Sequence, residues 1–116
     1  MLLLKKINFF TLFSYADSNK YVFTVVKNID NTSVKNQASS GTCWSYSTNS
    51  FLESEMIRMG KEPIDLAEIF TARCVYKDKA DMYVRLHGGL SWGDGGSCHD
   101  VINVFAKYGA LPQSIY

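Results

Sequence analysis

A stretch from Gln37 to Ser47 constrains this chain more than any other feature of its sequence. Residues 38–42 form a Ser/Gly-rich loop that leads directly into a segment with a helical pattern, and Cys43 stands at the junction. The N-terminus of a helix carries roughly half a positive charge, which favours the thiolate form of a cysteine placed there. Gln37 precedes Cys43 by six residues and offers side-chain N–H donors. Together with the backbone N–H of Cys43, it can form a two-donor oxyanion hole for an acyl intermediate.

The same stretch resembles the active-site segment of papain-like cysteine peptidases, C-G-[SA]-C-[WY]. The chain departs from this pattern at Ser40, which replaces the first cysteine, and at Thr42, which replaces Ser or Ala. The branch that it resembles most contains bleomycin hydrolase and bacterial aminopeptidase C. The residues that carry this likeness are Ser39–Trp44, Phe51–Glu55, Asp78–Ala80 and Tyr83–Arg85.

The resemblance implies a set of site residues and a fold. Cys43 would be the nucleophile and Gln37 the oxyanion donor. Gly95 and Gly96 match the glycine pair whose second member binds the substrate backbone like an added strand. Gly41 and Trp44 are placed in the substrate-binding segment as well. The implied fold is α+β: the mainly helical N-terminal lobe of a two-lobed peptidase.

A disulfide of papain is absent from this chain. The resemblance places its two half-cystines at Ser40 and Gly93, so both partners are missing together. This agrees with the alignment, sets the chain outside the papain subgroup and fits a reducing compartment.

The catalytic base is the part of the mechanism that the sequence does not supply. Its only histidines are His87 and His99, and both are expected on the surface or at a helix N-terminus. In papain-like enzymes the histidine and asparagine follow the cysteine by roughly 130–150 residues, well beyond Tyr116. We therefore expect a fragment whose partner is the missing C-terminal lobe. The alternative is a non-catalytic papain lobe that only binds peptides or other partners.

Composition and charge restrict the ligands. The 116 residues are 47% hydrophobic and 20% charged with a net charge of +1, which is typical of a soluble globular domain. Near-neutral charge gives no footprint for nucleic acid, and no apolar run is long enough to span a membrane. Peptide is the expected substrate, and no metal or organic cofactor is implied. The branch resemblance implies aminopeptidase action, often within a hexamer.

The N-terminus is expected to lie outside the folded lobe, which we assign to residues 17–116. Residues 1–16 have a basic start, a short apolar stretch and small residues at Ser14 and Ala16, and they resemble a secretory signal that is cleaved after Ala16. The alternative is a disordered or truncated N-terminus. The location is accordingly secreted or periplasmic with a signal and cytoplasmic without one.

Four elements are predicted along the lobe. Residues 21–26 are β-branched and aromatic and predict a strand. A helix is expected from Cys43 to Met59, with Gly60 as its stop and an apolar stripe of Trp44, Phe51, Leu52, Met56 and Met59. A second is expected from Leu66 to Val75 or on to Leu86, opened by a capping box of Asp65 and Glu68. A third covers residues 97–108.

Three further residues are interpreted as structural or left without a role. Glu53 is expected to be a partly buried hydrogen-bond acceptor, and Cys74 a small core residue. No role is derived for Cys98. The cysteines and histidines lack the close spacings of a zinc site, so none is predicted.

Overall fold

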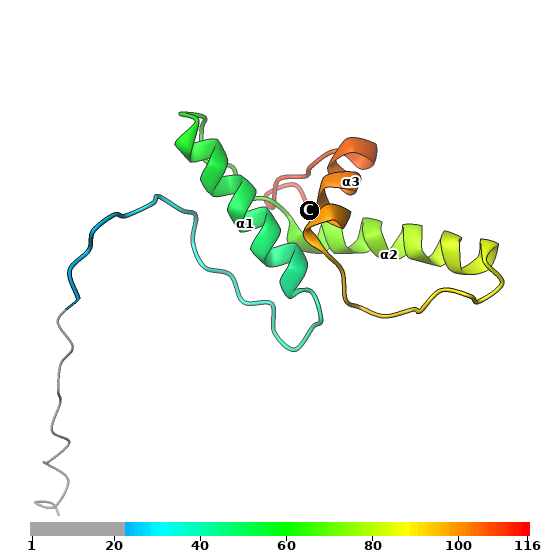
Figure 1. Cartoon of the computed structure of the whole chain (residues 1–116). Coiled ribbons are helices and arrows are strands. Elements are labelled where there is room, and N and C mark those ends of the chain that lie inside the picture. The colour runs from blue at the N-terminus through cyan, green and yellow to red at the C-terminus, as the bar shows by residue number, and fades with distance from the viewer. Residues whose placement is uncertain (1–22) are drawn as a thin grey trace, which may run out of the picture.

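Three helices form the folded part of the chain that the structure describes, residues 23–116 of this computed structural model. They are α1 (Cys43–Arg58), α2 (Glu68–Arg85) and α3 (Cys98–Tyr108). Figure 1 shows α1 and α3 packed against α2, with the segment before α1 running as an irregular chain beside that helix. A long loop leaves the far end of α2 and returns to the start of α3. Among residues 23–116, no helix is both long enough and apolar enough to cross a membrane.

Helix α1 begins and ends close to its predicted bounds, but it packs through polar side chains. Gly60 adopts the left-handed conformation expected of a helix stop, with φ of 71°. The predicted apolar stripe is wrong in part, since Phe51 and Met59 are 61% and 58% exposed. The buried residues of α1 are Trp44, Ser45, Thr48, Asn49 and Glu53. The hydroxyl of Ser45 donates to the Glu68 carbonyl oxygen at 2.8 Å, so a buried hydrogen bond adds to the apolar packing between α1 and α2.

Helix α2 reaches the longer of its two predicted ends, but the predicted capping box is wrong. Its N-cap is Ala67, and no side chain caps the first turn. Asp65 and Glu68 instead both contact the ammonium group of Lys35, which lies on the preceding loop. A cation that lies thirty or more positions earlier in the sequence thus contacts both carboxylates that a local capping box would have used.

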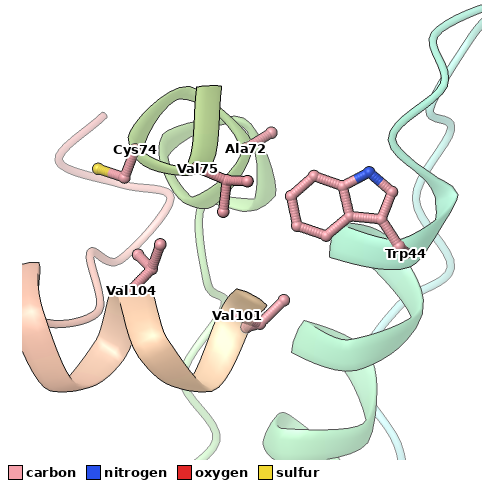
Figure 2. Packing of buried hydrophobic residues seen from close by; sticks show 6 residues of the cluster. All are labelled: Trp44, Ala72, Cys74, Val75, Val101 and Val104. Atoms are coloured by element: carbon pink, nitrogen blue, oxygen red, sulfur yellow. The ribbon is translucent and has the colours of Figure 1, made fainter. Parts of the chain in front are cut away.

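The hydrophobic core lies where the three helices meet. Figure 2 shows the indole of Trp44 directed from α1 toward Ala72 and Val75 of α2 and Val101 of α3. Cys74 and Val104 extend the same cluster, and Cys74 is buried as predicted. Helix α3 begins after Ser97, whose backbone N–H and hydroxyl both donate to the Asp100 carboxylate, at 2.8 and 3.1 Å.

No strand occurs among residues 23–116. The predicted strand at residues 21–26 is irregular from 23 to 26, and its first two residues lie outside the described part. Within this described range, the one β-type contact is an isolated antiparallel bridge between Leu66 and Pro112. The described chain agrees with a mainly helical lobe, whereas the β component of the predicted α+β fold stays a prediction. The predicted signal at residues 1–16 lies outside the described residues.

Candidate active site

Cys43 is the first residue of α1, and its side chain is exposed. The preceding residue, Thr42, is the N-cap, and its carbonyl oxygen accepts from the N–H groups of Ser45 and Tyr46. No acceptor within residues 23–116 takes the backbone N–H of Cys43. The first turn of α1 contains no acidic residue that would oppose a negative charge there. An accessible sulfur atom therefore stands beside an unpaired N–H group at the positive end of a helix.

The loop before Cys43 is held in a tight turn. Ala38 has φ of 53°, and its N–H is accepted by the side-chain oxygen of Asn36 at 2.8 Å. The Gln37 amide nitrogen donates to the Ser40 carbonyl oxygen at 2.9 Å, while the Ser40 hydroxyl donates to the Gln37 carbonyl oxygen at 2.7 Å. An amide nitrogen carries two hydrogens, so one donor of Gln37 remains after this bond.

Cys43 and Gln37 line one cleft of about 330 Å³. Tyr46, Ser47 and Ser50 continue it along α1, and Thr32 to Lys35 form its opposite wall. The nucleophile and the oxyanion donor expected from the sequence therefore meet in a single open space. The roles themselves remain predictions.

Lys35 fixes that opposite wall to the helices behind it. Its ammonium lies 2.5 Å from Glu68 and 3.5 Å from Glu53, donates to the Leu66 carbonyl oxygen at 2.8 Å and also contacts Asp65. Burial alone would lower the pKa of Lys35, but the hydrogen bonds and charges of these carboxylates outweigh it and raise the pKa above its ordinary value.

Glu53 is the buried acceptor that the sequence predicts. Its side chain is 1% exposed, accepts from the Leu66 N–H at 2.7 Å and is hydrogen-bonded to the Thr32 hydroxyl. Two residues of the cleft wall, Thr32 and Lys35, are thus tied to one carboxylate of α1.

The glycine-rich loop before α3 is tied to both other helices. The Asp94 carbonyl oxygen accepts from the Trp44 indole N–H at 3.0 Å and from the Tyr76 hydroxyl at 2.7 Å. The Asp94 carboxylate accepts from the Gly41 N–H at 3.1 Å. Burial and the nearby charge of Asp94 raise the pKa of Tyr76, which keeps the phenol protonated as a donor. Gly41 and Asp94 immediately follow Ser40 and Gly93, so the two segments that the missing disulfide would join do lie together.

Gly96 sits directly against the ring of Trp44. A Cβ atom at this position would come within 2.6 Å of the indole, closer than atoms can pack. Gly96 is exposed, and neither its N–H nor its C=O is hydrogen-bonded within residues 23–116. Trp44 is only 7% exposed, so its indole lies beneath this surface and is in contact with Gly96 from the inside.

The remaining histidines and cysteines lie apart from the cleft. His87 follows the end of α2 and His99 is the second residue of α3; both are exposed, and neither lines the cleft of Cys43. Burial, the leading cause, raises the pKa of the Cys74 thiol. Cys98 is exposed at the first residue of α3. Among the described residues, no group of three or more His, Cys, Asp or Glu is placed to hold a metal.

Sequence reasoning missed the residues that position the site. Lys35 and Asp94 act through contacts that span 33 and 53 residues, so no local pattern reveals them. The only signal for Asp94 is a charged residue standing among five nearby glycines.

The family described as papain family cysteine protease matches residues 20–114. A search of curated proteins finds no match.

Proposed function

The chain belongs to the papain family of cysteine proteases, and from this premise we propose that it carries the nucleophile and oxyanion hole of a thiol peptidase. One observation carries the proposal: the exposed sulfur of Cys43 opens α1 and shares a cleft with Gln37. A packed structural cysteine would be buried, as Cys74 is.

The chemistry follows from these positions. The Cys43 thiolate attacks the carbonyl carbon of a peptide bond, and the carbonyl oxygen takes the negative charge. The free N–H of Cys43 and the remaining donor of Gln37 hold that oxygen. The amine then leaves with a proton, and water releases the acyl group and regenerates the thiol. Gly96 supports substrate binding, because its unpaired N–H and C=O can pair with an extended peptide.

The proton requires a base, which we propose lies in a second lobe with the family's histidine and asparagine. Neither His87 nor His99 lines the cleft, and this supports a base from elsewhere. The chain is then the N-terminal lobe of an incomplete α+β enzyme. Aminopeptidase action, a hexameric assembly and the branch with bleomycin hydrolase remain proposals that rest on the resemblance of residues 39–55 and 78–85.

The second candidate is a lobe that binds peptides without cleaving them. The free edge of Gly96 and the separation of both histidines from the cleft favour it equally well. The reading frame decides between the two: a continuation that encodes a histidine and then an asparagine favours the peptidase, whereas a stop codon after Tyr116 with stable expression favours the binding module.

The nucleophile is tested by comparing two cysteines of this one chain. Cys43 and Cys98 are both exposed first residues of helices, but the first turn of α3 contains Asp100, whereas that of α1 has no acid. We expect iodoacetamide at about pH 6 to label Cys43 at least about tenfold faster than Cys98, with buried Cys74 slowest. Mass spectrometry of peptides gives the three rates. Equal rates at Cys43 and Cys98 contradict the proposal.

An epoxide attached to a peptide tests the second half of the proposal. The thiolate opens the epoxide ring, the new bond joins sulfur to carbon, and the oxygen takes a proton from water. We expect the peptidyl epoxide to label Cys43 faster than an epoxide without a peptide, while Cys98 shows no preference. A ratio of one at Cys43 means that the cleft does not recognise peptide.

A further inference from the structure

Asp94 is the point at which the glycine-rich loop contacts the loop before Cys43 and the two helices α1 and α2. Its carboxylate holds the Gly41 N–H, two residues before Cys43, and its carbonyl oxygen holds the Trp44 indole, one residue after Cys43. The Tyr76 hydroxyl reaches the same carbonyl oxygen from α2. One residue of the glycine-rich loop therefore contacts the chain on both sides of the proposed nucleophile.

The carbonyl groups around Asp94 are all occupied. Lys79 of α2 donates to the Gly93 carbonyl oxygen at 3.3 Å and to that of Gly95, while Trp44 and Tyr76 share the oxygen of Asp94. Three consecutive carbonyl oxygens thus accept hydrogen bonds from side chains of α1 or α2. Gly96 is the next residue, and its N–H and C=O are without partners in the described chain. These hydrogen bonds hold the loop as far as Gly95, and Gly96 after it is the residue that would contact a peptide.

Gly41 has no side chain, and this allows the Asp94 carboxylate to lie close to the Gly41 N–H. A Cβ atom on Gly41 would lie 2.2 Å from the nearer Asp94 carboxylate oxygen. Alanine at position 41 would therefore push the carboxylate away from the N–H that it accepts. The contact requires both the Asp94 carboxylate and a glycine at position 41, so a substitution of either residue should have the same consequence.

We propose that Asp94 is a positioning residue, which fixes the Gly95–Gly96 edge against α1 and thereby sets the affinity of the chain for an extended peptide backbone. The inference rests on the proposed peptide-binding function. Asp94 acts through the loop and touches neither the sulfur nor the substrate, so its loss should weaken peptide binding without changing the intrinsic reactivity of Cys43.

The first test follows hydrogen exchange at the indole N–H of Trp44 by NMR in the whole chain. Asp94→Ala should raise this rate at least about tenfold, because the hydrogen bond from the Gly41 N–H to the charged carboxylate is lost and the glycine-rich loop loosens. Asp94→Asn keeps an acceptor oxygen and should restore most of the protection. Trp92, which is 55% exposed, provides the internal control and should not change. A Trp44 rate within twofold of wild type in Asp94→Ala overturns the inference.

The second test uses Gly41→Ala. If both residues serve one contact, the double variant Gly41→Ala/Asp94→Ala should exchange no faster than either single variant. Multiplicative effects would show that the two act separately and would overturn the shared role.

The third test measures peptide affinity with a peptidyl aldehyde, which forms a reversible hemithioacetal: sulfur bonds to the aldehyde carbon, and the thiol proton ends on the oxygen. Asp94→Ala should raise Kd at least about tenfold while iodoacetamide labels Cys43 at the wild-type rate. An unchanged Kd overturns the inference alone. Failure of the wild-type chain to bind the aldehyde overturns the proposed function instead.

If Asp94→Ala does not fold, Tyr76→Phe tests the same inference in its place. It removes one of the two donors to the Asp94 carbonyl oxygen and leaves every loop intact. We expect the exchange rate of the Trp44 indole and the aldehyde Kd both to rise about threefold. Wild-type values for both overturn the inference.

Discussion

Gly96 and Trp44 are in such close contact that the glycine has no room for a Cβ atom, which would stand 2.6 Å from the indole ring. The Trp44 ring is in turn packed against Ala72, Val75 and Val101 in the core (Figure 2). The surface that would receive a peptide is therefore the outer side of the hydrophobic core. A substitution at Gly96 acts on both stability and binding.

Gly96→Ala should lower the free energy of unfolding by about 1–3 kcal/mol, because the ring must move out of a packed core. Gly95→Ala is the matched control: a Cβ there meets no atom within 4 Å, and Gly95 is not among the residues with positive φ. We expect the control to change stability by less than about 1 kcal/mol. Urea unfolding monitored by tryptophan fluorescence measures both. Equal effects of the two substitutions would contradict the close contact.

Gln37→Ala tests the proposed oxyanion role in the two-lobed enzyme that we propose. The loss of one oxyanion donor should lower kcat about 10²–10³-fold with KM nearly unchanged, because the interaction exists only in the transition state. Gln113→Ala, at an exposed glutamine outside the cleft, is the control. A loss of less than threefold would remove the role.

Lys35→Met should destabilise the lobe by about 3 kcal/mol, because Glu53 and Glu68 would remain buried without their cation. Lys61→Met, on an exposed lysine, should change stability by less than about 0.5 kcal/mol. Chemical denaturation at neutral pH measures the difference. An effect of Lys35→Met as small as that of the control would mean that solvent replaces the ion pairs.

The same lysine predicts an alkaline limit to stability. The carboxylates hold the pKa of Lys35 above its ordinary value of 10.5 in the folded state. Its contribution is therefore complete below about pH 10.5 and is lost as the pH rises through the folded-state pKa. The stability difference between wild type and Lys35→Met should be constant up to that pH and then shrink. A difference that grows with alkali would have the wrong sign.

Asp78→Asn tests the contact between α2 and α3 at low pH. Asp78 accepts from Lys107 at 2.8 Å and from the Tyr108 hydroxyl at 2.5 Å. Burial alone would raise the pKa of Asp78, but these partners lower it below its ordinary value of 3.8. Its contribution is present above about pH 4 and is lost as the pH falls through the folded-state pKa.

We expect a modest effect of about 0.5–1 kcal/mol at neutral pH, since the Asp78 side chain is 37% exposed and solvent screens the pair. The effect should disappear in acid. Asp81→Asn, which breaks only an exposed pair with Arg85 on the same helix, is the control. A stability difference that persists below the folded-state pKa of Asp78 would contradict the assigned contact.

The helices and the position of Cys43 were predictable because each depends on neighbouring residues. Cys43 at the junction of loop and helix, the stop at Gly60 and the third helix all follow from local pattern. The apolar stripe of α1 was only partly right, because Phe51 and Met59 are apolar but face outward. Periodicity shows which residues share a face, whereas burial depends on what packs against it.

The capping box at Asp65 and Glu68 failed for a related reason. A local motif competes with every partner that folding brings near, and Lys35 offers a full positive charge where the backbone offers a dipole. Such competition can be judged only once the distant residue is in place.

The sequence by itself determined the position of the proposed reactive element: a cysteine that begins a helix after a tight loop with a glutamine, because these features lie within eleven residues of one another. Tertiary structure alone decided how that element is held. Lys35 reaches Glu68, which is 33 positions away, and Asp94 reaches Gly41, which is 53 positions away. Their geometry depends on how three helices pack, which no local pattern contains.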